Sequence, residues 1–185
     1  PIRSSAASDV YKRQAILFLF YKNNTIEKKD ISFIGRGYFE IISQPRFLQA
    51  MVASAFGYAI MTFLMTATPI SMHVMENMSL DKTSLVIQMH VASMFLPSLI
   101  TGNLIKKFGH SKIMYVGLLL YGVTIVLSLL DQTFFNYLIA LIFLGFGWNF
   151  LFISGTSLLV TTYKEQEKFK AQGLNDFVVY SVHAI

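Results

Sequence analysis

The chain has 185 residues, of which 54% are hydrophobic and only 14% are charged, and its mean hydropathy is +0.54. A soluble domain of this length needs far more polar surface, so the composition excludes an ordinary soluble protein. The net charge is +5 and the sequence contains no cysteine. The apolar residues fall into long blocks, which is typical of helices that cross a bilayer.

The first 46 residues precede these long blocks. Residues 1–14 begin with Pro1 and resemble a translated library adapter, so we interpret them as a leader that is not native. Residues 15–21 are apolar but too short to span a bilayer, and no small-residue cleavage pattern follows them. We interpret them as the end of a preceding transmembrane helix. Residues 22–46 are charged and interrupted by glycine and proline, which predicts a cytoplasmic linker between two helical bundles.

Four blocks that contain no Lys, Arg, Asp or Glu follow the linker. A helix rises about 1.5 Å per residue, so roughly 20 residues cross the hydrocarbon core, and each block reaches this length. The blocks are continuous rather than alternating, which favours helices over barrel strands. Pro97 should kink the second block. We predict an all-α membrane protein with complete transmembrane helices at 47–71, 84–105, 113–130 and 136–161, and a truncated one at 172–185.

Basic residues are concentrated in alternate connections between the blocks. Eleven of them lie in the linker 22–46, between the second and third blocks, and after the fourth, whereas the other two connections hold only Lys82. Because cytoplasmic loops are enriched in Lys and Arg, this pattern places the basic connections in the cytoplasm. The anionic inner leaflet therefore accounts for the net positive charge, and we expect no nucleic-acid partner.

The connection between the second and third blocks reads G-N-L-I-K-K-F-G-H-S-K, from Gly102 to Lys112. We expect Gly102 to let two helices approach closely and Gly109 to take a positive φ in a short turn. The segment resembles the G-x-L-x-D-R-x-G-R-R/K loop of the major facilitator superfamily. The matching positions are Gly102, Leu104, Lys107 and Gly109, with Lys112 near the trailing basic position.

Lys106 departs from that motif, because the family has an acidic residue at this position, and the departure favours the C-terminal half of such a transporter. Residues 67–69, 88–90, 147–150 and 172–177 are also similar to bacterial members of the family. The resemblance extends from about residue 15 to residue 185. It implies a partial helical bundle that contains the end of helix six, complete helices seven to ten, and the first part of helix eleven.

In that family, helices seven, eight, ten and eleven line a central cavity, while helix nine faces lipid. The distribution of polar residues agrees, because residues 113–130 contain no His, Asn, Gln or charge. The resemblance and the cost of polar groups in hydrocarbon make several side chains candidates for a substrate site. They are Asn149, Trp148, Gln88 and Thr156.

Two of these candidates have a structural alternative. Asn149 could instead form an interhelical hydrogen bond, and Trp148 could pack against helices or lipid. His90 and Asp176 are candidates for proton coupling. The alternatives are a neutral, hydrogen-bonded His90 and an Asp176 that caps the start of its helix.

The sequence contains no Walker loop, no H-E-x-x-H and no histidines at metal-ligand spacing, so we expect no enzyme activity, cofactor or metal site. The resemblance implies a proton-coupled secondary transporter in a bacterial inner membrane. Its solute would be a small molecule such as a drug, a metabolite or a vitamin, for example riboflavin. Its expected partners are the solute, the bilayer and an N-terminal helical bundle of the same chain, without which this fragment should not transport. The alternative is a membrane receptor or anchoring subunit that has no transport cycle.

Overall fold

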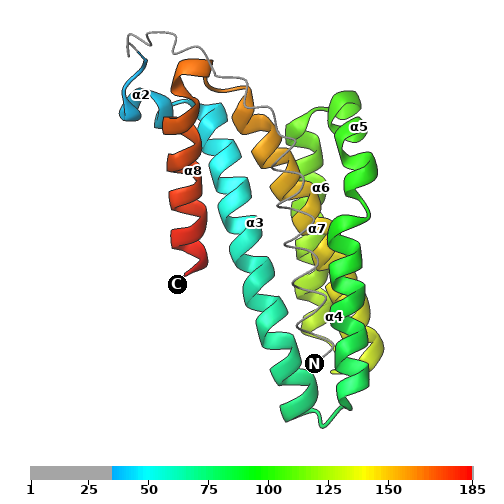
Figure 1. The fold of residues 1–185 in the computed structure, drawn as a ribbon. Coiled ribbons are helices and arrows are strands. Elements are labelled where there is room, and N and C mark those ends of the chain that lie inside the picture. Colours follow the sequence, from blue (N-terminus) through cyan, green and yellow to red (C-terminus); the bar gives the residue numbers. More distant parts are fainter. Residues whose placement is uncertain (1–34, 185) are drawn as a thin grey trace, which may run out of the picture. The chain divides into compact units, whose positions relative to one another are not determined.

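The computed structural model describes residues 35–184. The predicted leader, the predicted end of a preceding helix and most of the predicted linker lie outside the described residues. Within residues 35–184 the chain is helical and contains no strand. The elements shown in Figure 1 are α2 (Tyr38–Ile42), α3 (Pro45–Pro69), the π-helix η1 (Ile70–Met75), α4 (Leu80–Phe95), α5 (Ser98–Phe108), α6 (His110–Ser128), α7 (Phe134–Val160), the 3-10 turn η2 (Glu165–Glu167) and α8 (Lys168–His183).

Three helical segments of the described chain are long and apolar enough to cross a membrane: Pro45–Met75, His110–Ser128 and Phe134–Val160. Helices α4 and α5 pass the same test together and make a fourth span if they are counted as one, although they are bent by 41° relative to each other at the break that contains Pro97. The all-α membrane protein predicted from the sequence is therefore confirmed. The helix predicted at 172–185 begins earlier, at Lys168.

The bend between α4 and α5 has a local cause. Pro97 has no N–H with which to bond the carbonyl oxygen of Ser93, one turn earlier. The carbonyl oxygen of Pro97 instead starts the next helix, because it accepts a hydrogen bond from the N–H of Thr101 at 2.9 Å. The kink expected at Pro97 is confirmed, and it separates two distinct helices.

Short polar residues precede α4 and α7, and a glycine precedes α6. The Ser79 hydroxyl accepts a hydrogen bond from the N–H of Lys82 at the start of α4, and the Thr133 hydroxyl accepts one from the N–H of Asn136 at the start of α7. Gly109 lies between α5 and α6 with a φ of 86°, as the sequence predicted for this turn. Because this φ is strained for other residues, glycine permits the tight connection.

Helix α7 packs against α3, α4 and α6, and each contact is made at a glycine. A Cβ atom on Gly145 would lie 2.8 Å from the carbonyl oxygen of His90 in α4, and one on Gly155 would lie 2.9 Å from that of Ala50 in α3. A Cβ on Gly147 would lie 2.6 Å from the ring of Tyr121 in α6. Small residues therefore let the backbones approach, as is usual between membrane helices.

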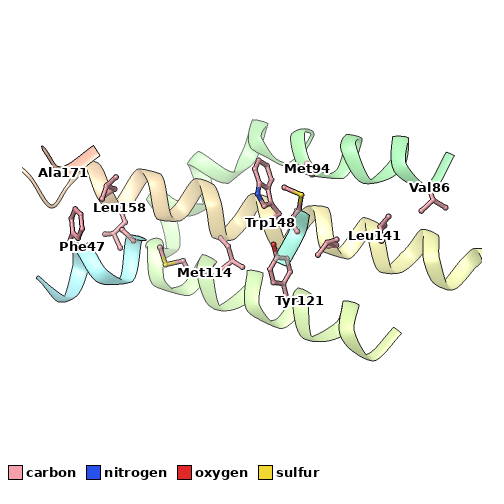
Figure 2. Packing of buried hydrophobic residues seen from close by; sticks show 14 of the residues in the cluster. Phe47, Val86, Met94, Met114, Tyr121, Leu141, Trp148, Leu158 and Ala171 are labelled. Carbon is pink, nitrogen blue, oxygen red and sulfur yellow. The ribbon is translucent and has the colours of Figure 1, made fainter. Parts of the chain in front are cut away.

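The close approach expected at Gly102 is not found. Apart from its own turn of α5, no part of the described chain lies within 4 Å of a Cβ built on Gly102. The apolar core instead follows α7, from Phe47 and Leu158 near one end, past Met114 and Tyr121, to Val86 near the other (Figure 2).

Candidate functional site

Asn149 forms a network with the broken helix. Its side chain is fully buried near the middle of α7. The amide Nδ2 donates to the carbonyl oxygen of Met94 at 2.7 Å and to the hydroxyl oxygen of Ser98 at 2.7 Å. The hydroxyl of Thr101 donates to Oδ1 of Asn149 at 2.6 Å. We call these four residues the Asn149 network, and they join α7 to both sides of the break at Pro97.

The Asn149 network uses both N–H groups and the oxygen of the amide. The side chain therefore forms the interhelical hydrogen bonds that were the structural alternative for this residue. Its predicted contact with a substrate stays a prediction, and it requires one of these hydrogen bonds to open. The network lies at the break, where a proline has already weakened the helix.

Aromatic rings from neighbouring helices gather beside the Asn149 network. Trp148 is stacked on Phe152 with a centroid distance of 5.0 Å and an interplanar angle of 10°. Phe95 of α4 lies edge-on to Trp148 at 6.3 Å, and Tyr58 of α3 lies 5.7 Å from Phe152. The ring of His183 in α8 lies edge-on to Tyr58 at 5.0 Å. We call these five residues the ring cluster.

The ring cluster brings together α3, α4, α7 and α8, the four helices that the resemblance places around a central cavity. Of these five residues, only Trp148 was a candidate from the sequence. The spacing of Trp148 and Phe152 by four residues places them on one helix face and was a usable signal. Nothing in the sequence indicates that Tyr58 and Phe95 meet them, because those contacts depend on how three helices pack.

His90 is fully buried between α4 and α7. Its Nδ1 is 2.8 Å from the carbonyl oxygen of Leu141, whereas its Nε2 has no hydrogen-bond partner among the described residues. With Nδ1 as the donor, the ring is neutral and Nε2 keeps a free lone pair. The geometry thus holds one nitrogen in place and leaves the other without a hydrogen-bond donor among the described residues.

The remaining candidates are more exposed and lie apart from the Asn149 network. Gln88 is exposed and donates to the hydroxyl oxygen of Ser84. Thr156 is half-buried and bonds the carbonyl oxygen of Phe152 within its own helix. Asp176 is exposed in the middle of α8, so the alternative that it caps the start of this helix is wrong.

The predicted cytoplasmic loop motif lies at the connection of α5 and α6. Lys107 and Lys112 are exposed, and the ammonium group of Lys107 lies 5.3 Å from the centre of the Phe108 ring. Leu104 is half-buried. The neighbouring Ser111 hydroxyl accepts a hydrogen bond from Arg46 at 3.1 Å, which ties this connection to the start of α3.

An ion pair at the same end was not singled out from the sequence. The guanidinium of Arg36 bonds both carboxylate oxygens of Glu167, at 2.8 and 2.6 Å, and Glu167 is only 2% exposed. Backbone N–H groups of Arg36 and Lys164 also bond this carboxylate. The Arg36 hydrogen bond is the main cause that holds the pKa of Glu167 well below its ordinary value, and Glu167 in turn raises the pKa of Arg36. The pair ties the segment before α2 to the connection of α7 and α8.

Within residues 35–184, no three His, Asp or Glu side chains gather closely enough to hold a metal ion. The polar groups of the Asn149 network, His90 and Trp148 are an amide, two hydroxyls, an imidazole and an indole. Such groups can bind a small solute through hydrogen bonds and ring contacts.

Comparison with known proteins identifies the family. The sequence pattern of the Major Facilitator Superfamily matches residues 15–185. The chain is 43% identical over 150 residues to the riboflavin transporter RfnT of Brucella anthropi, which covers 81% of this chain and 37% of that protein. It is 37% identical over 123 residues to each of two uncharacterized MFS-type transporters of Bacillus subtilis, YddS and YdeG.

The match to the two Bacillus subtilis proteins covers 65% of this chain and 28% of each of them. The chain thus spans about a third of the length of these curated relatives. No solved structure matches it. The family match agrees with the four apolar spans, the charged connections and the loop motif, and the chain belongs to the Major Facilitator Superfamily.

Proposed function

We propose that the full-length protein is a secondary transporter that moves a small solute across a bacterial inner membrane by alternating access, coupled to protons. The Asn149 network carries the proposal. It places buried polar groups at a helix break in the middle of a membrane span, where polar groups are costly and usually serve function. Discontinuous helices with polar groups near the midplane are typical of solute sites in secondary transporters.

The proposed substrate contacts are Asn149, Trp148, Gln88 and Thr156. Asn149 is supported by its position at the break, where a solute that takes over one of its hydrogen bonds would alter the joint between α7 and the broken span. Trp148 is supported by its place in the ring cluster. Gln88 and Thr156 are supported only by their polarity on helices that should line the cavity.

The proposed proton-coupling residues are His90 and Asp176. His90 has the stronger support, because its unpartnered Nε2 can take up a proton when α4 and α7 separate. Asp176 is the alternative, as a carboxylate on the exposed side of α8. The further partners are the lipid bilayer and an N-terminal bundle of the same protein, which together with this bundle would enclose the solute.

Riboflavin is the first solute to test, because a relative 43% identical to this chain is named as a riboflavin transporter. Full-length protein in proteoliposomes should take up or release riboflavin, or a member of a panel of dyes and drugs, in response to a proton gradient. Replacement of Asn149 by alanine should abolish this flux, while Asn103→Ala on the exposed side of α5 serves as the control. A folded full-length protein that moves no solute of the panel under any gradient would refute the proposal.

The coupling residue can be identified in the same assay. We expect His90→Ala to abolish solute-dependent proton flux while solute exchange without a gradient persists. Asp176→Asn should retain both fluxes if His90 is the coupling group. The reverse result, with proton flux lost only in Asp176→Asn, would assign coupling to α8 instead.

A further inference from the structure

Trp148 is the buried ring of the ring cluster, and the other rings are at least partly exposed. Trp148 is only 7% exposed and supports Phe152 through the parallel stack. Phe95 is 60% exposed, and Tyr58 and Phe152 are half-buried. The helices of residues 35–184 therefore leave ring area of Phe95, Tyr58 and Phe152 uncovered. Here the rings at the edge of the cluster remain accessible.

The ring cluster also lies directly beside polar groups. Trp148 precedes Asn149 in α7, and Phe95 follows Met94, whose carbonyl oxygen accepts a hydrogen bond from Asn149. The ring cluster and the Asn149 network therefore adjoin each other along α7 and α4. Aromatic walls with a few fixed polar groups are the usual composition of a small-molecule site.

One polar atom of the ring cluster lacks a partner. The indole Nε1 of Trp148 is buried and has no hydrogen-bond acceptor among the described residues. A buried N–H usually finds an acceptor, because leaving it unpaired is unfavourable. Heteroaromatic solutes carry ring nitrogens and carbonyl oxygens, which are acceptors of the kind that this N–H lacks.

We propose that Tyr58, Phe95 and Phe152, supported by Trp148, form a stacking platform for a flat, conjugated heteroaromatic ring. This inference rests on the proposed function, since it names the class of solute that the transporter would bind. Aromatic side chains stack on conjugated rings of many kinds, because such contacts use the faces of both rings. A saturated sugar or an aliphatic solute has no conjugated face for such stacking.

The residues have different roles. Phe152 and Tyr58 offer ring faces to the solute, and Phe95 closes the arrangement from the broken helix. Trp148 is a positioning residue for Phe152, since the stack fixes the orientation of the Phe152 ring, and it also supplies the unpaired N–H. Phe146 and Phe150 form a second ring pair in α7 that contacts none of the cluster rings, and they provide a matched control.

Binding to the full-length protein in detergent tests the platform directly. The probe is riboflavin, whose fluorescence should be quenched when its ring stacks against aromatic side chains. We expect Phe152→Leu and Tyr58→Leu to weaken binding by about tenfold or more, and Phe152→Tyr and Phe146→Leu to bind within about threefold of the parent. Thermal unfolding of each variant would verify that it is folded.

Competition experiments distinguish the ring from the rest of the probe. Lumichrome, which keeps the flat ring without the ribityl chain, should displace riboflavin, whereas ribitol should not. In transport assays, Phe152→Leu should raise KM for a ring-containing solute and leave the maximal rate within about twofold, because it alters binding rather than the conformational cycle.

Several results would overturn the platform. These are unchanged binding in folded Phe152→Leu and Tyr58→Leu, displacement by ribitol as efficient as by lumichrome, and failure of the folded protein to bind riboflavin or any flat dye of the panel. Failure of the transport proposal has a different signature. In that case, riboflavin binds in a manner that depends on Phe152 and Tyr58, but proteoliposomes show no flux.

Discussion

At the scale of single residues, the importance of Asn149 could be predicted from the sequence, whereas its hydrogen-bond partners could not. Its place near the middle of a charge-free block indicated a buried polar group, because the block must span the bilayer. Its partners could not be inferred, since Met94, Ser98 and Thr101 meet it only through the bend at Pro97. The sequence therefore predicted an important position and left its hydrogen bonds undetermined.

Replacement of Asn149 by alanine should destabilise the bundle. The change removes three hydrogen bonds and leaves buried groups of α4 and α5 without their partner. We expect a loss of about 2–4 kcal/mol in the free energy of unfolding. Thermal unfolding in detergent would measure it, with Asn103→Ala as an exposed control in α5. Equal stability of the two variants would show that the Asn149 network contributes little.

The Glu167 carboxylate should make stability depend on pH in the acid range. Its pKa in the folded protein lies below the ordinary value of 4.5, so its stabilising effect is fully present above that value and is lost as the pH falls. Glu167→Gln should lower stability at neutral pH by on the order of 1 kcal/mol and flatten the acid dependence. Unfolding followed from about pH 3 to about pH 7 would reveal both the lower stability at neutral pH and the flatter acid dependence.

The exposed neighbour Glu165 provides the control for this experiment. Glu165→Gln should leave the acid dependence of the parent unchanged, because the Arg36 contacts are made by Glu167. If Glu167→Gln retained the same acid dependence as the parent, the ion pair would not be its source.

At the scale of helices, the number and order of spans were readable because hydrophobic length and charge are properties of local sequence. The break at Pro97 was expected for the same reason. The glycine contacts were less predictable, because helix packing decides which glycines face a neighbour. Gly102 was expected to mediate close approach and lies open, whereas Gly145, Gly147 and Gly155 make the contacts.

Alanine substitutions at glycines of α6 and α7 test this packing. Gly155→Ala would place a methyl group against Ala50 and Ser54, and Gly147→Ala would place one against Tyr121. Each should destabilise the bundle by about 1–3 kcal/mol, because the backbones must move apart. Gly122→Ala in α6 has open space and should be neutral or slightly stabilising.

Unfolding of these three variants in detergent would rank them. The packing described for α7 predicts that Gly122→Ala remains close to the parent while the other two unfold more readily. A ranking in which Gly122→Ala is the most damaging would contradict it.

At the scale of the whole molecule, the family was readable from the sequence because its loop motif, charged connections and span order are all linear features. The ring cluster was not, because it is assembled from four helices that lie far apart in the sequence. The cytoplasmic placement of the basic connections stays a prediction, although the structure brings several of them together. Arg46 and Ser111, for example, are joined by a hydrogen bond at that end.

Cysteine labelling tests this orientation, since the chain contains no cysteine of its own. In a cysteine-free form of the full-length protein, Asp131→Cys should react with a membrane-impermeant thiol reagent added to intact cells. Lys112→Cys should react only after the membrane is opened, because the basic connections should face the cytoplasm. The opposite pattern would invert the assigned topology.

Alternating access itself is tested most directly at the break, with a cysteine in place of Ser98. This residue is exposed, belongs to the Asn149 network and lies beside the ring cluster. In proteoliposomes of the full-length protein, Ser98→Cys should react with an impermeant thiol reagent from either side of the membrane, and a transported solute should protect it from both. Reaction from only one side, or from neither, would contradict a site that opens alternately to the two faces of the membrane.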